Sequence, residues 1–250
     1  MMQAVNTERK LVGRDALRDG AKAMGVHLTE EMLDAFLLYN RLLLEWNQKL
    51  NLTALTAPED VLHKHFLDSL ALGRAPDSHE IKSVADIGSG AGFPGIPLKI
   101  AHPDWEITLV DALGKRVRFL EDVISELELK GITAVHARAE EIGRDAVHRG
   151  RYDCCVTRAV SALPVIAEYG LPLLRTGGLF AAYKGRQYHE ELATSGAALE
   201  ELGGALRGVF PYQIGPPEDA AERALILVKK IGATPEKYPR RPGKPEKNPL

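Results

Sequence analysis

Three glycines at alternate positions separate an apolar segment from the expected start of a helix. Gly88, Gly90 and Gly92 follow residues 84–87, and the prolines at 94 and 97 favour a helix that begins near them. Glycines permit unusual dihedral angles and close approach to a ligand, and the free N–H groups of a helix start attract polar ligands. The pattern fits a nucleotide-like ligand, although a tight structural turn explains the glycines alone equally well.

An acidic residue follows the glycines at the distance expected for a nucleotide site. Asp111 lies 23 residues after Gly88 and directly follows the apolar segment 107–110. A carboxylate at the end of the next strand offers two acceptor oxygens to the two ribose hydroxyls. Its alternative role is to cap the following helix. We expect Asp86, inside the first strand, to orient the glycine loop or to bind an amino group through water.

Charged residues follow three more strand-like segments. Arg138, Ala139 and Glu140 follow the segment 133–137, where backbone and carboxylate groups can bind the exocyclic amine of adenine. Arg158 and Lys184 end two later segments. The carboxyl ends of parallel strands border the ligand crevice of an open α/β sheet, so we expect these groups to gather there. The alternatives are a helix start for Glu140 and ordinary surface cations for Arg158 and Lys184.

The spacing of apolar residues predicts the elements that hold these groups. Residues 7–75 have helical spacing, with Thr29 as the N-cap of a helix to about residue 50 and a further helix after Pro58. From residue 84, apolar segments alternate with helices, as in a doubly wound α/β sheet. The segments 206–212 and 224–231 lack room for a crossover helix between them, so they should pair antiparallel. The pattern resembles the Rossmann-like, mostly parallel fold of class I S-adenosyl-L-methionine (SAM) methyltransferases.

The C-terminal residues carry a charge opposite to that of the rest of the chain. Residues 229–250 contain seven Lys or Arg and two Glu, a local charge of +5 in a chain of formal net charge −2. Their prolines disfavour a helix or a central strand, so we expect an extended arm. The arm either contacts a polyanion or is a solvated tail. If the polyanion is RNA, truncation after Gly232 should weaken RNA binding and flatten its salt dependence while sparing SAM affinity.

Composition and missing motifs exclude several classes of protein. No apolar run approaches the roughly 20 residues that span a bilayer, so we expect a cytoplasmic protein without membrane contact. Cys154 and Cys155 are adjacent in an expected strand and fit neither a disulfide framework nor a nucleophile at a strand tip. The segment after them lacks the Asn/Asp-Pro-Pro-aromatic turn of adenine-N6 and cytosine-N4 methylases. His63 and His65 do not share a helix face, so we expect no metal site.

Several longer motifs are specific to one family. Together they resemble the RsmG family, also called GidB, of bacterial guanine-N7 methyltransferases of small-subunit ribosomal RNA. The resemblance covers nearly the whole chain from about residue 42. The motifs are Asp86-Ile-Gly-Ser-Gly-Ala-Gly-Phe-Pro-Gly-Ile-Pro-Leu98, His65-Phe-Leu-Asp-Ser-Leu70, Arg138-Ala-Glu140, Thr157-Arg-Ala-Val160, Lys184-Gly185, Glu222-Arg223, Lys237-Tyr-Pro-Arg240, Pro242-Gly-Lys-Pro245 and Pro249-Leu250.

The resemblance implies a domain organisation and a set of site residues. We expect a helical extension at 1–75, a SAM-binding methyltransferase domain at 76–232 and a basic arm at 233–250. The residues implied to contact SAM are Gly88, Gly90, Gly92, Phe93, Asp111, Ala112, Leu113, Ala139, Glu140 and Arg158. Arg138, Lys184 and Arg223 are implied as catalytic or RNA-facing residues. The arm would bind RNA through Lys237, Arg240, Arg241, Lys244 and Lys247.

The implied reaction is methylation of guanine N7 in the 530 loop of 16S ribosomal RNA by a monomer. The substrate is either free RNA or a small-subunit assembly intermediate. Because N7 has a lone pair and no proton, the reaction requires no general base. The side chains expected to stack on the guanine are Phe93 or Tyr183. Two alternatives remain: a nucleotide-dependent oxidoreductase, and a non-catalytic nucleotide- and RNA-binding factor in ribosome assembly.

Overall fold

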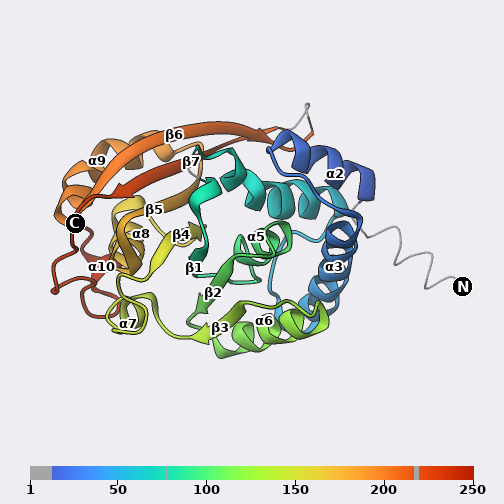
Figure 1. The fold of residues 1–250 in the computed structure, drawn as a ribbon, viewed down its shortest axis with the longest axis horizontal. Coiled ribbons are helices and arrows are strands. Elements are labelled where there is room, and N and C mark those ends of the chain that lie inside the picture. The colour runs from blue at the N-terminus through green and yellow to red at the C-terminus, as the bar shows by residue number, and fades with distance from the viewer. Residues whose placement is uncertain (1–12, 77, 217–219) are drawn as a thin grey trace, which may run out of the picture.

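One seven-stranded sheet runs through the protein, with helices on both of its faces (Figure 1). The computed structural model describes residues 13–76, 78–216 and 220–250. The strand order is β3-β2-β1-β4-β5-β7-β6, and β7 runs antiparallel to both of its neighbours. The strands are β1 (Ser83–Ile87), β2 (Glu106–Asp111), β3 (Ile132–His136), β4 (Tyr152–Arg158), β5 (Leu174–Gly185), β6 (Gly204–Ile214) and β7 (Ala221–Lys230).

The sheet confirms the predicted fold class. Each predicted strand segment forms a strand, and the last two strands pair antiparallel as expected. The parallel register aligns Ile87 with Val110 and Thr157 with Ala182, so the carboxyl ends of β1, β2, β4 and β5 lie at one edge. The antiparallel β7 between β5 and β6 distinguishes this sheet from the all-parallel sheet of dinucleotide-dependent dehydrogenases.

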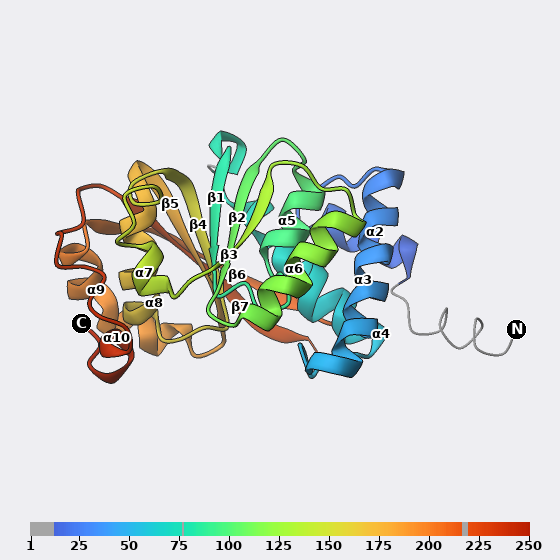
Figure 2. The same cartoon turned by 90° about the horizontal axis from the view of Figure 1, so that it is seen from below.

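Two helical layers enclose the sheet, as Figure 2 shows from its edge. One layer contains α3 (Glu30–Leu50), α5 (Gly95–Ala101) and α6 (Gly114–Glu126), and the other contains α7 (Ala139–Ile142), α8 (Leu163–Gly170) and α9 (Tyr188–Glu201). Buried apolar side chains such as Phe119 on one face and Ile166 on the other form the core. No helix among the described residues has the length and apolar character of a membrane span.

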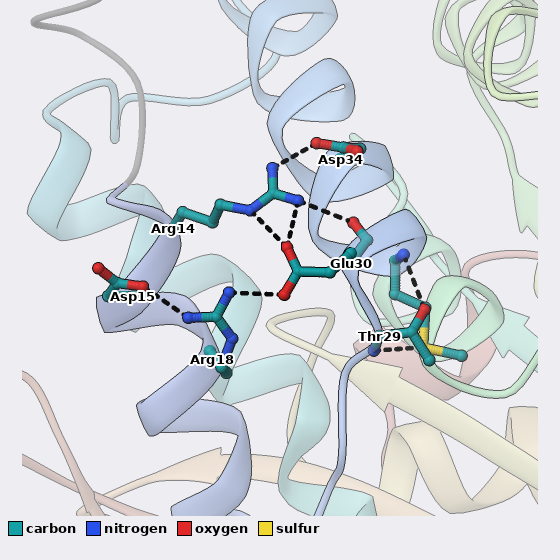
Figure 3. Close-up of polar contacts among 7 residues, drawn as sticks. Arg14, Asp15, Arg18, Thr29, Glu30 and Asp34 are labelled. Carbon is teal, nitrogen blue, oxygen red and sulfur yellow. Dashed lines mark hydrogen bonds and ion pairs between the residues drawn. The ribbon is translucent and has the colours of Figure 1, made fainter.

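The N-terminal helices are joined to each other by ion pairs (Figure 3). Arg14 and Arg18 of α2 (Arg14–Ala23) both bind the Glu30 carboxylate, at 2.7 and 2.8 Å. Glu30 is exposed and both arginines are partly exposed, so the pairs orient α2 more than they stabilise the fold. Thr29 Oγ1 accepts a hydrogen bond from the Met32 N–H at 3.3 Å, which confirms Thr29 as the N-cap of α3.

The segment after Pro58 differs from the single helix that we expected. It consists of α4 (Pro58–Asp60), a π-helix η1 (Val61–Leu67) and a 3-10 helix η2 (Leu70–Arg74); two further 3-10 turns are η3 (Ser78–Glu80) and η4 (Leu171–Leu173). A π-helix changes the direction of successive side chains and often occurs at functional sites. Here it buries His65, and Asp68 directly after it, against the sheet edge.

The C-terminal residues also differ from the expected extended arm. Residues 233–250 fold back over α7 and α8 and contain a short helix, α10 (Lys244–Lys247). Tyr238 and Pro245 are buried there. The prolines do prevent a long helix, but contacts that depend on tertiary structure hold the segment in a folded conformation.

Candidate functional site

The glycine loop after β1 has the backbone conformation that only glycine adopts easily. Gly88, Gly90 and Gly92 have φ angles of +73°, +59° and +95°. A Cβ atom on Gly92 would overlap the Ile96 side chain and lie 2.8 Å from the Tyr39 hydroxyl. Tyr39, fully buried on α3, donates a hydrogen bond to the Ala91 carbonyl in this loop. An N-terminal helix thus supports the loop directly.

Two carboxylates border the loop. Asp111, at the end of β2, accepts hydrogen bonds from the Gly90 N–H at 2.9 Å and the Leu113 N–H at 2.8 Å. It therefore closes the turn before α6 and also faces the glycine loop. Asp86 accepts from the Gly95 N–H at 2.9 Å, whereas its Oδ1 is buried without a hydrogen-bond partner among the described residues. Burial raises the pKa of Asp86 to about 7.

A small hollow lies between the glycine loop and α7. Its volume is about 160 Å³, and Gly88, Ala112, Ala139 and Glu140 line it. Glu140 is 5% exposed. Arg138, predicted as catalytic or RNA-facing, also lines this hollow, so it lies apart from Lys184 and Arg223.

A larger cleft of about 790 Å³ opens beyond the ends of β4 and β5. Arg158 lies on the floor of this cleft. Its guanidinium donates hydrogen bonds to the Asp68 carboxylate at 2.8 Å and to the Lys64 carbonyl at 2.9 Å. The Tyr212 hydroxyl donates to the other Asp68 oxygen at 2.7 Å. Arg158 was predicted to contact SAM, and the structure places it where the cleft meets the loop residue Phe93, with its guanidinium carbon 5.0 Å from the ring centroid.

His65 completes this floor as a neutral side chain. Its ring stacks on Phe93 with centroids 4.3 Å apart and planes 7° apart. Its Nδ1 lies 3.3 Å from an Arg158 N–H, so the other nitrogen carries the proton and donates it to Thr53 Oγ1 at 2.9 Å. Burial, and secondly the Arg158 charge, lower the pKa of His65 to about 3.

Lys184 and Arg223 lie together on the wall of the larger cleft. The Lys184 ammonium, 9% exposed, pairs with Glu191 at 2.6 Å and donates to the Ser161 carbonyl. Glu191 also accepts from the Leu163 N–H at the start of α8. Arg223 lies on β7, opposite Gly185 of β5. Two of the three residues predicted as catalytic or RNA-facing therefore line the same cleft.

The proposed base-stacking role of Phe93 and Tyr183 does not fit their surroundings. Phe93 is 5% exposed and lies against His65 and Arg158. Tyr183 is 4% exposed, and its hydroxyl donates to the Ser69 carbonyl at 2.8 Å. Neither ring is open to a nucleobase.

These observations fit a SAM cofactor. Cβ atoms would overlap neighbouring side chains at Gly88 and Gly92, and Asp86 has a buried oxygen that lacks a partner among the described residues. A small hollow beside the loop is lined by Ala112 and Glu140. The strand order, with an antiparallel β7, is that of the class I fold. Fold and site together define a class I SAM-dependent methyltransferase.

Comparisons with known proteins identify the family. The family model described as "rRNA small subunit methyltransferase G" (GidB) matches residues 32–209. The ribosomal RNA small subunit methyltransferase G of Acetivibrio thermocellus is 46% identical over 97% of this chain and 99% of its own length. That of Staphylococcus aureus is 44% identical over 94% and 97%. The chain belongs to the rRNA small subunit methyltransferase G family, and it is a SAM-dependent rRNA methyltransferase.

Solved structures with low sequence identity share the fold. A 16S rRNA (adenine(1408)-N(1))-methyltransferase variant from Catenulisporales acidiphilia has a TM-score of 0.51 at 13% identity, covering 61% of this chain and 89% of that one. The branched-chain polyamine synthase of Thermus thermophilus has a TM-score of 0.53 at 15% identity, covering 67% and 57%. At such identities the likeness concerns the fold alone.

Sequence reasoning missed several residues that build the site. His65 and Asp68 lie in one of the family motifs, but the sequence assigned neither of them a role in the site. Local spacing could not identify Tyr39, Tyr212 or Glu168, because each bonds to a residue far away in the sequence. Their partners Ala91, Asp68 and Arg240 are 52, 144 and 72 residues away. Cys154 and Cys155 are fully buried within β4, as expected of structural thiols.

The raised pKa of Asp86 predicts a pH-dependent cofactor affinity. Its carboxyl is protonated in the fold below about pH 7, so its contribution to stability is lost as pH rises from the unfolded value, about 3.8, through about 7. Arg158 lowers the pKa of Asp86 and Asp111 raises it. If Asp86 faces the ammonium group of SAM, as expected from the sequence, the carboxylate formed above pH 7 should attract that group. SAM affinity, measured by calorimetry from pH 6 to 8, should rise more steeply in the wild type than in Asp86→Asn. Parallel curves would contradict this role.

Proposed function

We propose that this methyltransferase transfers the methyl group of SAM to N7 of a guanine in the 530 loop of 16S ribosomal RNA. In this proposal Asp111 binds the ribose, Glu140 and Ala139 bind adenine, and the loop at Gly88–Phe93 holds the methionine end. The larger cleft receives the guanine. The protein acts in the cytoplasm as a monomer on RNA that is either free or part of an assembling small subunit.

The chemistry of the larger cleft carries the proposal. Of its described acidic side chains, Asp68 is paired with Arg158, and Glu191 is paired with Lys184. With a pKa of about 3, His65 is a poor proton acceptor. A nucleophile that must lose a proton would find no general base here. Guanine N7 attacks through its lone pair and needs none, so this acceptor fits the cleft best.

Positioning is then the main contribution of the protein. SAM supplies an electrophilic methyl group on a sulfonium. Arg158, held by Asp68 and His65, gives the cleft a rigid floor beside the glycine loop. A rigid floor favours in-line attack because it limits the motion of the base. In this proposal Arg223, on the wall of the cleft, binds a phosphate of the RNA, and Lys184 is held in the same wall by its ion pair with Glu191.

The shape of RNA limits which guanines can react. N7 faces the deep, narrow major groove of an A-form helix, which side chains cannot enter. A cleft of about 790 Å³ accommodates a base that is unstacked or in a loop. A loop target agrees with the 530 loop that the family resemblance implies.

A transcript that lacks N7 tests the acceptor atom. The 530-loop region is transcribed with guanosine or with 7-deazaguanosine and incubated with labelled SAM. We expect methyl transfer to the first transcript and none to the second, although both retain the phosphates and the Watson–Crick edge. Equal labelling of both transcripts would refute N7 as the acceptor.

We expect Arg223→Gln to weaken RNA binding without changing SAM affinity. Loss of one phosphate contact should lower the slope of log K against log salt by about 1. The matched control is Arg175→Gln, which removes the same charge at the opposite end of β5, where Arg175 pairs with Asp153. Fluorescence anisotropy at several salt concentrations gives the slopes. Equal slopes for Arg223→Gln and the wild type would contradict a phosphate role.

A further inference from the structure

The C-terminal segment is attached to the layer that contains the small hollow. Arg144, after α7, donates to the carbonyls of Lys237 at 3.1 Å and Pro239 at 2.7 Å. Arg149 donates to those of Thr234 at 2.9 Å and Tyr238 at 2.8 Å. Because these hydrogen bonds end on backbone carbonyls of the C-terminal segment, they fix the path of that segment toward α8.

A buried ion pair then anchors the segment. Both oxygens of Glu168, which is fully buried on α8, bind the Arg240 guanidinium, at 2.9 Å from Nε and 2.5 Å from Nη2. The Arg240 N–H also donates to Glu168, at 2.7 Å. A paired, bidentate arrangement is the strongest geometry for such a contact. Arg240, predicted as an RNA ligand, is therefore engaged by Glu168, and its side chain is only 17% exposed.

Three residues after this anchor, the segment reaches the hollow. The Gly243 N–H donates to Glu140 Oε1 at 2.8 Å, and the Tyr169 hydroxyl lies 3.5 Å from the same oxygen. Gly243 and Glu246 line the hollow together with Glu140 and Ala139. Within the described chain, both recorded hydrogen bonds of this carboxylate go to Oε1. Its second oxygen, Oε2, has no hydrogen-bond partner among these bonds.

We propose that residues 240–246 form a wall of the SAM site and that Arg240 is a positioning residue. The Arg240–Glu168 pair places the Gly243 N–H on Glu140 Oε1, which orients Oε2 to accept a hydrogen bond from the adenine amine. The basic tail thus contributes to recognition of the adenine nucleoside. This inference rests on the proposed placement of adenine beside Glu140.

The two roles of the tail make opposite predictions. A tail that contacts only RNA can be removed without loss of SAM affinity. A tail that forms a wall of the hollow cannot, because truncation after Gly232 removes Arg240, Gly243 and Glu246. Truncation after Gly232 should therefore lower SAM affinity as well as RNA binding.

Binding of two nucleosides that differ only at the amine tests the inference. S-adenosylhomocysteine carries the 6-amino group, and S-inosylhomocysteine carries a carbonyl in its place. We expect Arg240→Met to lower affinity for the adenosine ligand about tenfold, as when a hydrogen bond to a charged group is weakened, and to leave affinity for the inosine ligand nearly unchanged. Arg240→Lys should retain part of the preference. Arg151→Met, an exposed charge removed elsewhere, is the matched control.

A second variant distinguishes loss of the adenine contact from unfolding of the protein. Arg240→Met leaves the Glu168 charge buried and unpaired, whereas the double variant Glu168→Gln/Arg240→Met removes both charges. Thermal unfolding without ligand reports whether each variant is folded. The inference is overturned if the folded double variant binds both nucleosides as the wild type does, or loses both equally. Neither result depends on RNA, so failure of the N7 assignment is detected separately by the 7-deazaguanosine transcript.

Discussion

Gly92→Ala should lower SAM affinity about 10- to 100-fold, corresponding to the roughly 1–3 kcal/mol that a residue in a disfavoured backbone region costs. Gly92 has a φ angle of +95°, and an added Cβ would overlap Ile96 and approach the Tyr39 hydroxyl. Relief of this overlap moves either the glycine loop or α3. Calorimetry with SAM measures the loss.

Gly196→Ala is the control for this substitution. Gly196 is exposed on α9, and a Cβ there meets no atom within 4 Å. It should bind SAM as the wild type does and be more stable by about 0.5–1 kcal/mol, because alanine favours helix over glycine. If Gly92→Ala bound SAM as tightly as Gly196→Ala, the glycine loop would not be the cofactor cradle.

The second large effect is expected at Arg158. Replacing it by Met removes the partner of Asp68, which is 6% exposed, and the contact with His65 Nδ1. An unpaired buried charge costs about 3–5 kcal/mol, so the free energy of unfolding should fall by about that amount. Methyl transfer should be lost as well, because the floor of the cleft is no longer fixed. Urea unfolding and labelled methyl transfer measure the two effects.

The double variant Asp68→Asn/Arg158→Met separates stability from catalysis. It leaves no buried charge unpaired, so most of the lost stability should return. Methyl transfer should stay low, since Arg158 is still absent. Recovery of both properties together would mean that Arg158 serves the fold alone.

The sheet could be predicted from sequence because its signals are local. Apolar runs such as 107–110, bounded by turns, mark the strands, and Asp111 follows one of them directly. The short connection between the segments 206–212 and 224–231 already indicated the antiparallel pair. Local spacing therefore identified the elements and the strand ends at which the predicted site residues lie.

The floor and wall of the site could not be predicted because they depend on distant contacts. A π-helix at Val61–Leu67, which the helical spacing did not indicate, places His65 on Phe93. The pair of Arg240 with Glu168 joins residues 72 positions apart. Composition marked the tail as basic, but only its tertiary contacts show that Arg240 is engaged by a buried carboxylate.

Mapping of 7-methylguanosine in ribosomal RNA tests the central claim most directly. RNA from cells with and without this gene is compared by a cleavage reaction specific for 7-methylguanosine, with the gene restored as wild type or as Gly92→Ala. We predict one modified guanine in the 530 loop of 16S ribosomal RNA that disappears on deletion, returns with the wild type and is reduced with Gly92→Ala. An unchanged 7-methylguanosine pattern in the deletion strain would contradict the proposed function.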